Sequence, residues 1–535
     1  MCKKFISKDK IYFKLQYNGC FFGNWKFFRP YLLIILMSIP FSLLAELSSE
    51  IDSISKPINI GSRRELFVDE SLIAEHKGIE FKLHQPVARE TVMTYDKPWE
   101  GSGSDFQVIF RDGDIIRMYY TAAQLTNTAG DKIGGHQAYA AYAESKDGIN
   151  WVRPDLGLFE FNGSKHNNIV WSMSHFDNFT PFKDPNPNCK PDEKYKAVAS
   201  GLGGLFAFKS ADAIHWSYLS DKPIIVKGKF DTQNNAFWDP IRKKYWCYIR
   251  DFHDSTGARI TDLVKGIRDI RVASSTDFLN WSDPQLVKFT DSIDVPLYTN
   301  QVVPYYRAPH LFVGFPLRYI DRTFSEAAMK ALPDPTHRQN RMKFSPRYGT
   351  VLTNGLFMTS YDGLLFKRWD EPFIPAGPER SNNWVYGDGL QNLGLIETPA
   401  QDPTASPEIS VYSIEGHWKD NTTLRRYSIR LDGFVSINAS HKGGEFITKN
   451  LTFLGKNLSL NFATSVSGSI LIELQDMNGK PLPGYAISDC DELFGDTTDR
   501  IVTWKNKSDV SDLAGKTIRV RMVLNGADVY SMKFN

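Results

Sequence analysis

The feature that most constrains this chain is a short turn motif that recurs along it. Residues 145–151 read SKDGINW, 210–216 read SADAIHW, 275–281 read STDFLNW and 360–366 read SYDGLLF, with a degenerate fifth copy, RLDGFVS, at 430–436. The copies are spaced by 65, 65, 85 and 70 residues. Repeats of this length predict an array of similar supersecondary units.

Strand-like segments precede each copy of the motif. In the first unit, FQVIF and IIRMYY flank the hairpin signal Asp112-Gly113. Helical periodicity is nearly absent, and SEAAMKAL at 325–332 is the one helix we expect. Each unit therefore reads as three or four antiparallel strands ending in a turn. We expect Ser and Asp to bond the turn backbone and Trp to pack under the next unit. Five such units predict a five-bladed β-propeller.

The sequence pattern changes after residue 440. Segments such as NLSLNFATS and TIRVRMVL alternate at strand period and are separated by turns, without the Ser-x-Asp repeat. A β-sandwich is the simplest interpretation. The predicted fold class is all-β, a five-bladed β-propeller followed by a β-sandwich. The predicted segments are a signal peptide or N-terminal anchor (1–45), lead-in strands packing on the propeller (46–98), the propeller (99–440) and the sandwich (441–535).

The N-terminal region has the features of a targeting segment. Residues 31–45 read YLLIILMSIPFSLLA and follow Lys26 and Arg29, which is typical of a signal peptide with cleavage near Ala45. The run is short for a spanning helix, and the alternative is that it stays as an anchor. We expect a secreted, periplasmic or cell-surface protein that meets a membrane only if this segment is retained.

Charge and motifs exclude several function classes. The chain has 63 basic and 61 acidic residues, but residues 1–45 hold seven bases and one acid, so the remainder is near −4. A mildly acidic body argues against a nucleic-acid partner. The five cysteines have no metal-binding spacing. No nucleotide-binding glycine motif, paired metal-binding histidines or serine nucleophile elbow occurs, and we expect neither a metal nor a cofactor.

The array of S-x-D-G-x-x-W turns followed by a sandwich resembles glycoside hydrolase families 32, 43 and 68. The resemblance covers roughly residues 60–535 and implies a carbohydrate substrate held in a funnel on the propeller axis. It also implies two or three carboxylates supplied by the first strands of successive blades. Sialidases carry a similar turn, S-x-D-x-G-x-x-W, but here Gly148 follows Asp147 directly.

The resemblance implies four candidate catalytic carboxylates. Asp105 or Glu100 would be the nucleophile or base at the first blade. Asp184, in Lys183-Asp184-Pro185, would stabilise the transition state, with Lys where family 32 has Arg. Asp231, before the third blade, would be the general acid. For each, a solvated loop or turn carboxylate is the alternative. The family-32 signatures Asn-Asp-Pro-Asn-Gly and Glu-Cys are absent.

Further polar and aromatic residues recur at equivalent places near the expected funnel. Amides there could bond sugar hydroxyls, arginines could hold a carboxylate or an anionic sugar or form exposed salt bridges, and tryptophan could stack on a sugar ring. The substrate-binding candidates are Trp99, Asn234, Asn235, Arg250, Asn300, Gln301, Arg318 and Asp388.

The sequence thus predicts a glycoside hydrolase acting on a poly- or oligosaccharide. Two alternatives stay open. One is a carbohydrate-binding propeller without activity, which the missing signatures favour, and the other is a cell-surface interaction protein. Fold alone does not decide between them.

Overall fold

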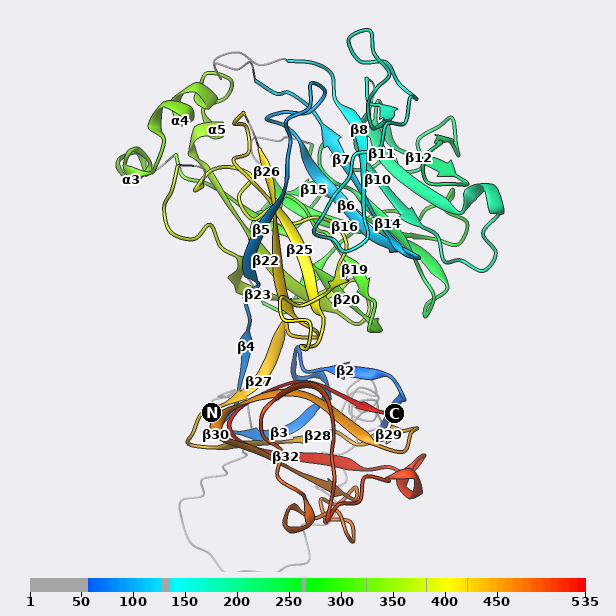
Figure 1. Cartoon of the computed structure of the whole chain (residues 1–535), viewed down its shortest axis with the longest axis vertical. Coiled ribbons are helices and arrows are strands. Elements are labelled where there is room, and N and C mark those ends of the chain that lie inside the picture. The colour runs from blue at the N-terminus through cyan, green and yellow to red at the C-terminus, as the bar shows by residue number, and fades with distance from the viewer. Residues whose placement is uncertain are drawn as a thin grey trace, which may run out of the picture. The chain divides into compact units, whose positions relative to one another are not determined.

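Five separate sheets follow one another along the chain and form the blades of a propeller (Figure 1). The computed structural model describes residues 56–126, 135–174, 176–261, 266–291, 293–323, 325–381, 383–420 and 422–535. The predicted leader, 1–45, lies outside the described residues. Within them, no helix is both long and apolar enough to span a membrane.

The first three blades are four-stranded antiparallel sheets built from consecutive strands. Blade one contains β6 (Asp105–Asp112), β7 (Ile115–Ala122), β8 (Tyr139–Ser145) and β9 (Ile169–Ser172). Blade two contains β10 (Phe176–Lys183), β11 (Tyr195–Gly201), β12 (Gly204–Ser210) and β13 (Ser217–Tyr218). Blade three contains β14 (Asn235–Asp239), β15 (Lys244–His253), β16 (Ile267–Ser275) and β17 (Gln285–Leu286).

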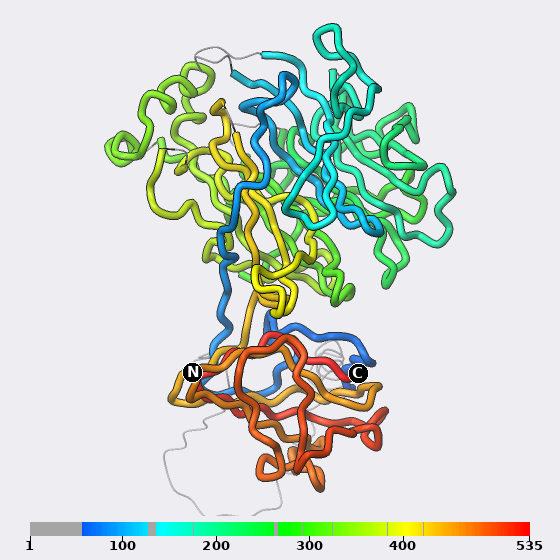
Figure 2. The backbone as a smooth tube through the Cα atoms, in the orientation of Figure 1, coloured from blue at the N-terminus to red at the C-terminus, as the bar shows by residue number. Residues whose placement is uncertain are grey.

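The last two blades depart from this pattern. Blade four contains β19 (Val303–Tyr305), β20 (Ala308–Gly314), β21 (Leu317–Asp321), β22 (Val351–Ser360) and β23 (Leu365–Ile374), with β18 (Lys288–Phe289) on its edge. Blade five contains β24 (Ile396–Thr398), β25 (Glu408–Glu415), β26 (Thr423–Arg430) and the N-terminal strand β5 (Val87–Thr94). Figure 2 shows this blue N-terminal strand beside the yellow strands of blade five. Pairing of β5 with β26 completes that blade as a four-stranded sheet. The predicted five-bladed propeller is confirmed.

The recurring motif forms the expected turn. Ser145 Oγ accepts the N–H of Gly148 at 2.9 Å, and Asp147 Oδ1 accepts the N–H groups of Ile149 and Asn150 at 2.8 Å. The same bonds recur around Ser210, Ser275 and Ser360. These hydroxyl and carboxylate acceptors satisfy the turn backbone, which is why the motif repeats.

The tryptophan of the turn packs on the preceding blade, which corrects the expectation that it packs under the next one. In blade two, the Trp216 ring lies 6.1 Å from the Tyr119 ring of blade one, and Tyr119 Oη donates to Ala213 O at 2.6 Å. Across the ring closure, Tyr412 Oη of blade five donates to Gly148 O at 2.6 Å. The turns at Ser145, Ser210 and Ser360 thus each receive a tyrosine hydroxyl from the blade before.

The C-terminal strands form a sandwich, as predicted, together with strands from the N-terminal region. Its C-terminal strands are β27 (Val435–Ala439), β28 (Gly444–Thr448), β29 (Leu451–Phe453), β30 (Leu458–Gln475), β31 (Asp496–Ile501) and β32 (Arg519–Phe534). The N-terminal strands are β1 (Ile58–Gly61), β2 (Arg64–Leu66), β3 (Ile73–Lys77) and β4 (Glu80–Leu83). Residues 46–98 were expected to pack on the propeller; within this range β5 does pair with blade five, whereas β2, β3 and β4 pair with sandwich strands. Pairing partners hundreds of residues away leave no local signal.

Short helices complete the fold. The expected helix at 325–332 is present as α3 (Glu326–Ala331), and it is followed by α4 (Pro335–Met342) and α5 (Arg347–Thr350). Figure 1 shows the three grouped beside blades four and five. The sequence of α4, PTHRQNRM, has no apolar face, so periodicity did not reveal it. Single-turn 3₁₀ helices occur at Glu70–Leu72, Pro191–Glu193, Ile487–Asp489 and Ser511–Leu513.

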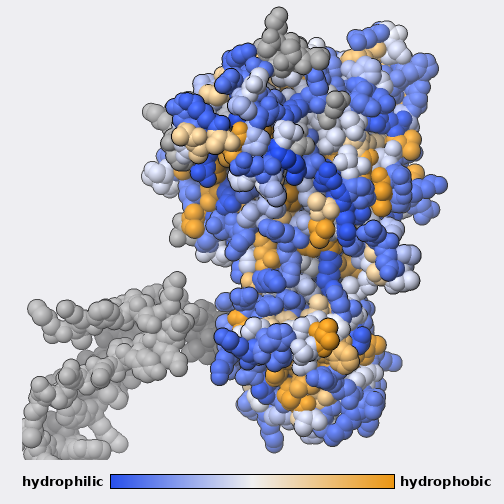
Figure 3. All heavy atoms as spheres, turned by 60° about the vertical axis from the view of Figure 1, so that its left-hand side comes forward, coloured by the Kyte–Doolittle hydropathy of each residue, from blue (hydrophilic) through white to orange (hydrophobic). Residues whose placement is uncertain are grey.

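The surface is mainly polar on the side that Figure 3 shows, where hydrophobic residues lie in small groups among hydrophilic ones. Exposed large apolar side chains include Leu202 in the propeller and Val466 and Phe494 in the sandwich. Scattered apolar residues of this kind are ordinary on a water-exposed protein.

Candidate active site

Two aspartates occupy matching positions at the start of neighbouring innermost strands. Asp105 opens β6 and Asp177 is the second residue of β10. The residue after each aspartate, Phe106 or Asn178, has a left-handed backbone with φ of 53° or 55°. In both strands the pairing register shifts at this point. Strained residues and bulges are found where a strand re-aims a functional side chain, so both blades present a carboxylate by the same backbone device.

Both carboxyl groups have a raised pKa, and the charge of Asp177 contributes to the shift of Asp105. Asp105 is 6% exposed, and its burial, followed by the negative charge of Asp177, raises its pKa well above the ordinary value. Asp177 is exposed to solvent, yet desolvation by the surrounding protein still raises its pKa, opposed by the N–H of Asn178 and the charge of Arg250. Asp105 therefore keeps a proton at pH values where an isolated aspartate has lost it.

Arg250 brings a third carboxylate to the same region. Arg250 lies on β15, is 4% exposed, and forms an ion pair with Asp231, whose side chain is 74% exposed. Arg250 Nε also donates to Lys229 O at 3.3 Å, and its guanidinium lies 5.3 Å from the ring centroid of Tyr298. The arginine therefore joins Asp231 to the neighbourhood of Asp177.

Three tyrosine rings contact Tyr386 and form with it the Tyr386 group: Tyr298, Tyr319 and Tyr348. The Tyr386 ring lies 5.7 Å from the rings of both Tyr298 and Tyr319, and it stacks on Tyr348 at 6.2 Å. Burial and the charges of Tyr298 and Asp105 are among the causes that raise the pKa of Tyr386. Tyr298 lies in the segment before β19, Tyr319 on β21, Tyr348 on α5 and Tyr386 in the loop before blade five, so the site is assembled from separate parts of the sequence.

His417 approaches Asp105 from blade five. Its Nδ1 lies 3.9 Å from Asp105 Oδ2, and that nitrogen is buried without a hydrogen-bond partner among the described residues. Burial, with the positive charges of Arg341 and His337, lowers the pKa of His417 well below its ordinary value. The imidazole is therefore neutral at physiological pH, and its contact with Asp105 is not an ion pair.

Glu100, the other first-blade candidate, lies in a closed network. It is 2% exposed and accepts a bond from Tyr120 Oη at 2.6 Å. Arg153 donates to both of its carboxylate oxygens, at 2.8 and 3.0 Å. These bonds give Glu100 a role in packing blade one, and the structure does not join it to the Asp105 and Asp177 pair.

Asp184 lies at the other end of blade two. It follows the last residue of β10, whereas Asp177 is near the first, and seven residues of strand span roughly 23 Å. Asp184 Oδ2 accepts bonds from Lys196 Nζ at 2.6 Å and from Tyr245 Oη at 2.7 Å. The adjacent Lys183 contacts Asp112, the last residue of β6, at 2.8 Å. Asp184 therefore belongs to the end of the blades opposite Asp105.

The predicted sugar-binding amides make bonds inside the propeller. Asn234, Asn235, Asn300 and Gln301 are each at most 2% exposed. Asn235 Nδ2 donates to Val302 O at 2.6 Å. Gln301 Nε2 donates to Gln233 Oε1 at 2.8 Å. Such bonds tie the innermost strands of neighbouring blades together, which gives these amides a structural role.

The remaining binding candidates differ in their surroundings. Trp99 Nε1 donates to Asn168 Oδ1 at 2.7 Å, and the ring packs against Phe161. Arg318 pairs with the exposed Asp370 at 2.7 Å. Asp388 is 6% exposed, and burial raises its pKa to about 7. Asp388 follows Tyr386 by two residues in the chain.

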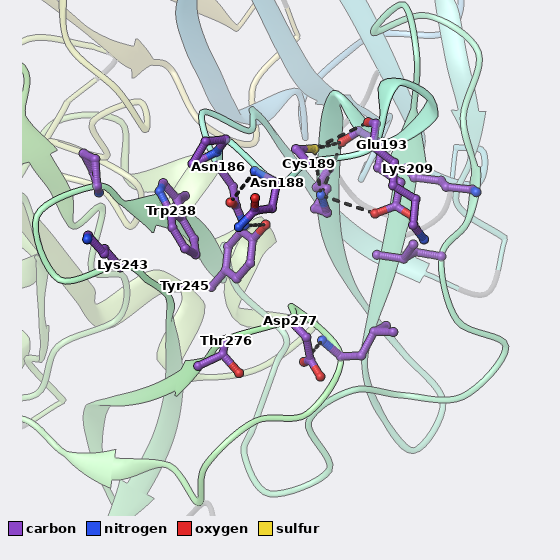
Figure 4. Close-up of a pocket in the computed structure, with 16 residues that line it drawn as sticks. Asn186, Asn188, Cys189, Glu193, Lys209, Trp238, Lys243, Tyr245, Thr276 and Asp277 are labelled. Atoms are coloured by element: carbon purple, nitrogen blue, oxygen red, sulfur yellow. Dashed lines mark hydrogen bonds and ion pairs between the residues drawn. The ribbon is translucent and has the colours of Figure 1, made fainter.

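A cavity of about 960 Å³ lies at the Asp184 end of blades two and three. Figure 4 shows Asn186, Trp238, Tyr245 and Asp277 around it. Asp277 is engaged in its turn, where its Oδ1 accepts the N–H of Leu279 at 2.9 Å. No pair of free carboxylates meets among the residues that line this cavity, so it is a poorer candidate for hydrolytic chemistry than the Asp105 end.

Asp177, His417 and the Tyr386 group were not predicted from the sequence. A signal for Asp177 was present, since Asp105 stands seven residues before Asp112 and Asp177 stands seven before Asp184. Aligning the first strands of units one and two on these pairs identifies Asp177. Among the described residues, no group of three or more His, Cys, Asp or Glu side chains could hold a metal ion.

Comparison with known proteins gives structural matches. No protein-family model matches the sequence, and no curated protein sequence matches it. A Bombyx mori family-32 β-fructofuranosidase matches with 8% identity over 93% of this chain and 99% of its own, at a TM-score of 0.36. A Bacillus subtilis family-43 arabinoxylan arabinofuranohydrolase matches with 11% identity over 84% and 99%, at a TM-score of 0.33.

An N-acetylgalactosamine deacetylase from F. plautii, solved with blood group B trisaccharide, also matches. It is 12% identical over 66% of this chain and 95% of its own, at a TM-score of 0.38. All three TM-scores are below 0.5, so the fold assignment rests on the strand pairing described above.

Proposed function

We propose that this protein is an exported glycoside hydrolase that acts on a poly- or oligosaccharide at the propeller end marked by Asp105 and Asp177. The observation that carries the proposal is the matched pair of aspartates, each at the start of an innermost strand and each followed by a left-handed residue. Hydrolysis of a glycosidic bond uses two carboxyl groups in different protonation states.

The electrostatics favour a division of roles within the pair. Asp105 is the more buried group, and its pKa is raised further by Asp177, so it is the better proton donor to the leaving oxygen. Asp177 faces solvent, and Arg250 favours its ionised form, which suits a nucleophile or base. Asp231 is the candidate for a third carboxylate, since it is exposed and held by Arg250.

The test is a reducing-sugar screen on plant and algal glycans with purified wild-type protein, Asp105→Asn and Asp177→Asn. We expect each substitution to reduce kcat by at least about 100-fold, the range typical of a lost general acid or base. Asp184→Asn is the matched control on the same strand as Asp177. It should lower thermal stability, because Lys196 loses its partner, while kcat is retained. Full activity in both site variants would refute the assignment.

One observation favours the non-catalytic alternative. Blade three has amides, Gln233, Asn234 and Asn235, where blades one and two have an aspartate at the start of the innermost strand. A carbohydrate-binding propeller needs no third acid. That alternative predicts glycan binding without release of reducing ends, and binding that survives Asp105→Asn.

A further inference from the structure

Arg341 is a buried arginine with unused hydrogen-bond donors. It lies on α4, is 2% exposed, and donates from Nη2 to Tyr386 O at 3.3 Å. Its Nε and Nη1 have no hydrogen-bond partner among the described residues. Burial lowers its pKa to about 10, so the group stays charged at neutral pH. An unpaired buried charge is costly, and an arginine in this state is poised for an anionic group from outside the chain.

Two more arginines flank the same aromatic group. The Arg268 guanidinium lies 4.0 Å from the ring centroid of Tyr319, and its Nε has no hydrogen-bond partner among the described residues. The Arg347 guanidinium lies 5.0 Å from the ring centroid of Tyr348, and Nη2 donates to the Oη of that tyrosine at 3.4 Å. Neither makes an ion pair within the described part of the chain.

The three arginines lie against tyrosine rings of the Tyr386 group. Arg268 lies over the Tyr319 ring and Arg347 over the Tyr348 ring. Both of these rings contact Tyr386. Arg341 lies 5.8 Å from the Tyr386 ring centroid, and 4.8 Å from that of Trp418. The positive charges of Arg268 and Arg347 also reach Arg250, where they add to burial in lowering its pKa. Distinct elements therefore direct positive charge at a single region.

Among the described residues, the carboxyl groups of this region form no ion pair with Arg268, Arg341 or Arg347. Asp231 is already paired with Arg250. Asp388, an acid whose charge acts on Arg341, has its pKa raised to about 7 by burial, so it is only partly ionised at neutral pH. Asp105 keeps a proton because its burial and the charge of Asp177 raise its pKa, whereas Arg250 favours the ionised form of Asp177. Asp321, whose charge acts on Tyr319, accepts a bond from Thr350 Oγ1 at 2.8 Å, and the three arginines therefore have no carboxylate partner among the described residues.

We propose that the region around Tyr386 binds an anionic saccharide, whose carboxylate or sulfate group is received by Arg268, Arg341 and Arg347 while its ring lies against the Tyr386 group. The proposal rests on the proposed action on carbohydrate. Guanidinium groups bind carboxylates and sulfates through paired charge-assisted bonds. A neutral sugar would leave the three charges without a counter-ion.

The test measures binding of defined oligosaccharides to the full-length chain by calorimetry. The probes are oligogalacturonate and its methyl ester, a sulfated galactan oligosaccharide and its desulfated form, and neutral xylo-oligosaccharide. We expect at least one anionic probe to bind at least about tenfold more tightly than its neutralised counterpart, with affinity that falls as salt rises. The two anionic probes distinguish a uronate from a sulfate ester.

Substitutions assign the binding to these side chains. Arg268→Gln and Arg347→Gln should each weaken anionic binding by about tenfold, the range for a lost charge-assisted bond. Arg500→Gln, on an exposed strand of the sandwich, is the matched control and should bind as wild type. Equal binding of charged and neutralised probes would overturn the proposal. So would wild-type affinity in both arginine variants, or no binding of either anionic probe.

The outcome separates this proposal from the hydrolase assignment. Hydrolysis of neutral glycans that Asp105→Asn abolishes, with no binding of anionic probes, would leave the hydrolase and remove the anionic substrate. Arginine-dependent binding of an anionic probe that is never cleaved would do the reverse.

Discussion

Replacing Asp432 by alanine should destabilise the protein far more than the same change in any other copy of the turn motif. Asp432 is fully buried in the degenerate fifth copy, RLDGFVS. It accepts bonds from Tyr305 Oη at 2.6 Å, Arg307 Nε at 2.8 Å and Ser531 Oγ at 2.8 Å, and Arg64 Nη1 lies 3.4 Å away. Tyr305 and Arg307 come from blade four, whereas Arg64 and Ser531 come from the sandwich. The carboxylate therefore joins the two.

The magnitude follows from what alanine leaves behind. Removing one partner of a buried ion pair costs about 3–5 kcal/mol, because the remaining charge is buried without a counter-ion. Here two arginines lose the same partner. Asp432 also has a left-handed backbone, with φ of 59°, which alanine tolerates less well. In Asp147→Ala, by contrast, only turn bonds are lost, and we expect a cost of about 1 kcal/mol.

Urea unfolding followed by tryptophan fluorescence and circular dichroism measures the difference. The Asp432→Ala midpoint should fall well below those of wild type and Asp147→Ala. Although burial opposes it, the charges of Arg307 and Arg64 hold the pKa of Asp432 below its ordinary value of 3.8. A depressed pKa means that the stabilisation is complete above about pH 5 and is lost as the pH falls below about 4. Equal midpoints for the two alanine variants would refute this account of the junction.

Two further predictions concern the site. Arg250→Gln removes a positive charge that lowers the pKa of Asp177, so the acidic limb of the kcat/KM profile should move to higher pH; an unchanged limb would contradict the role of Asp177 as the ionised group. Arg341→Met removes a buried charge without a carboxylate partner, so thermal melting should show equal or higher stability, with weaker binding of the anionic probe. A large loss of stability would mean that Arg341 is structural.

The propeller could be predicted because its blades each end in the same short sequence motif. The Ser145, Ser210, Ser275 and Ser360 turns each satisfy their own backbone, so each is legible within seven residues. The closing strand β5 could not be assigned to blade five, since its pairing with β26 joins residues more than 300 positions apart.

The site was predictable only in part. Asp105 follows from its place before a strand and a turn, and the same offset in unit two leads to Asp177. Asp184 was the more conspicuous choice, because Asp-Pro resembles a family step, but it stands at the wrong end of β10 to meet Asp105. Arg341 was beyond prediction. Its helix has no apolar face, and its burial depends on Tyr386 and Trp418 packing from other elements.

The central claim is that chemistry occurs between Asp105 and Asp177, and the most direct test is a crystal structure of the Asp105→Asn variant with a bound oligosaccharide. The account predicts that a glycosidic oxygen lies within hydrogen-bond distance, about 3 Å, of residue 105, with an anionic group of the sugar at Arg268, Arg341 or Arg347. A saccharide seated instead in the cavity beside Trp238 and Tyr245, with the Asp177 region free of sugar, would contradict it.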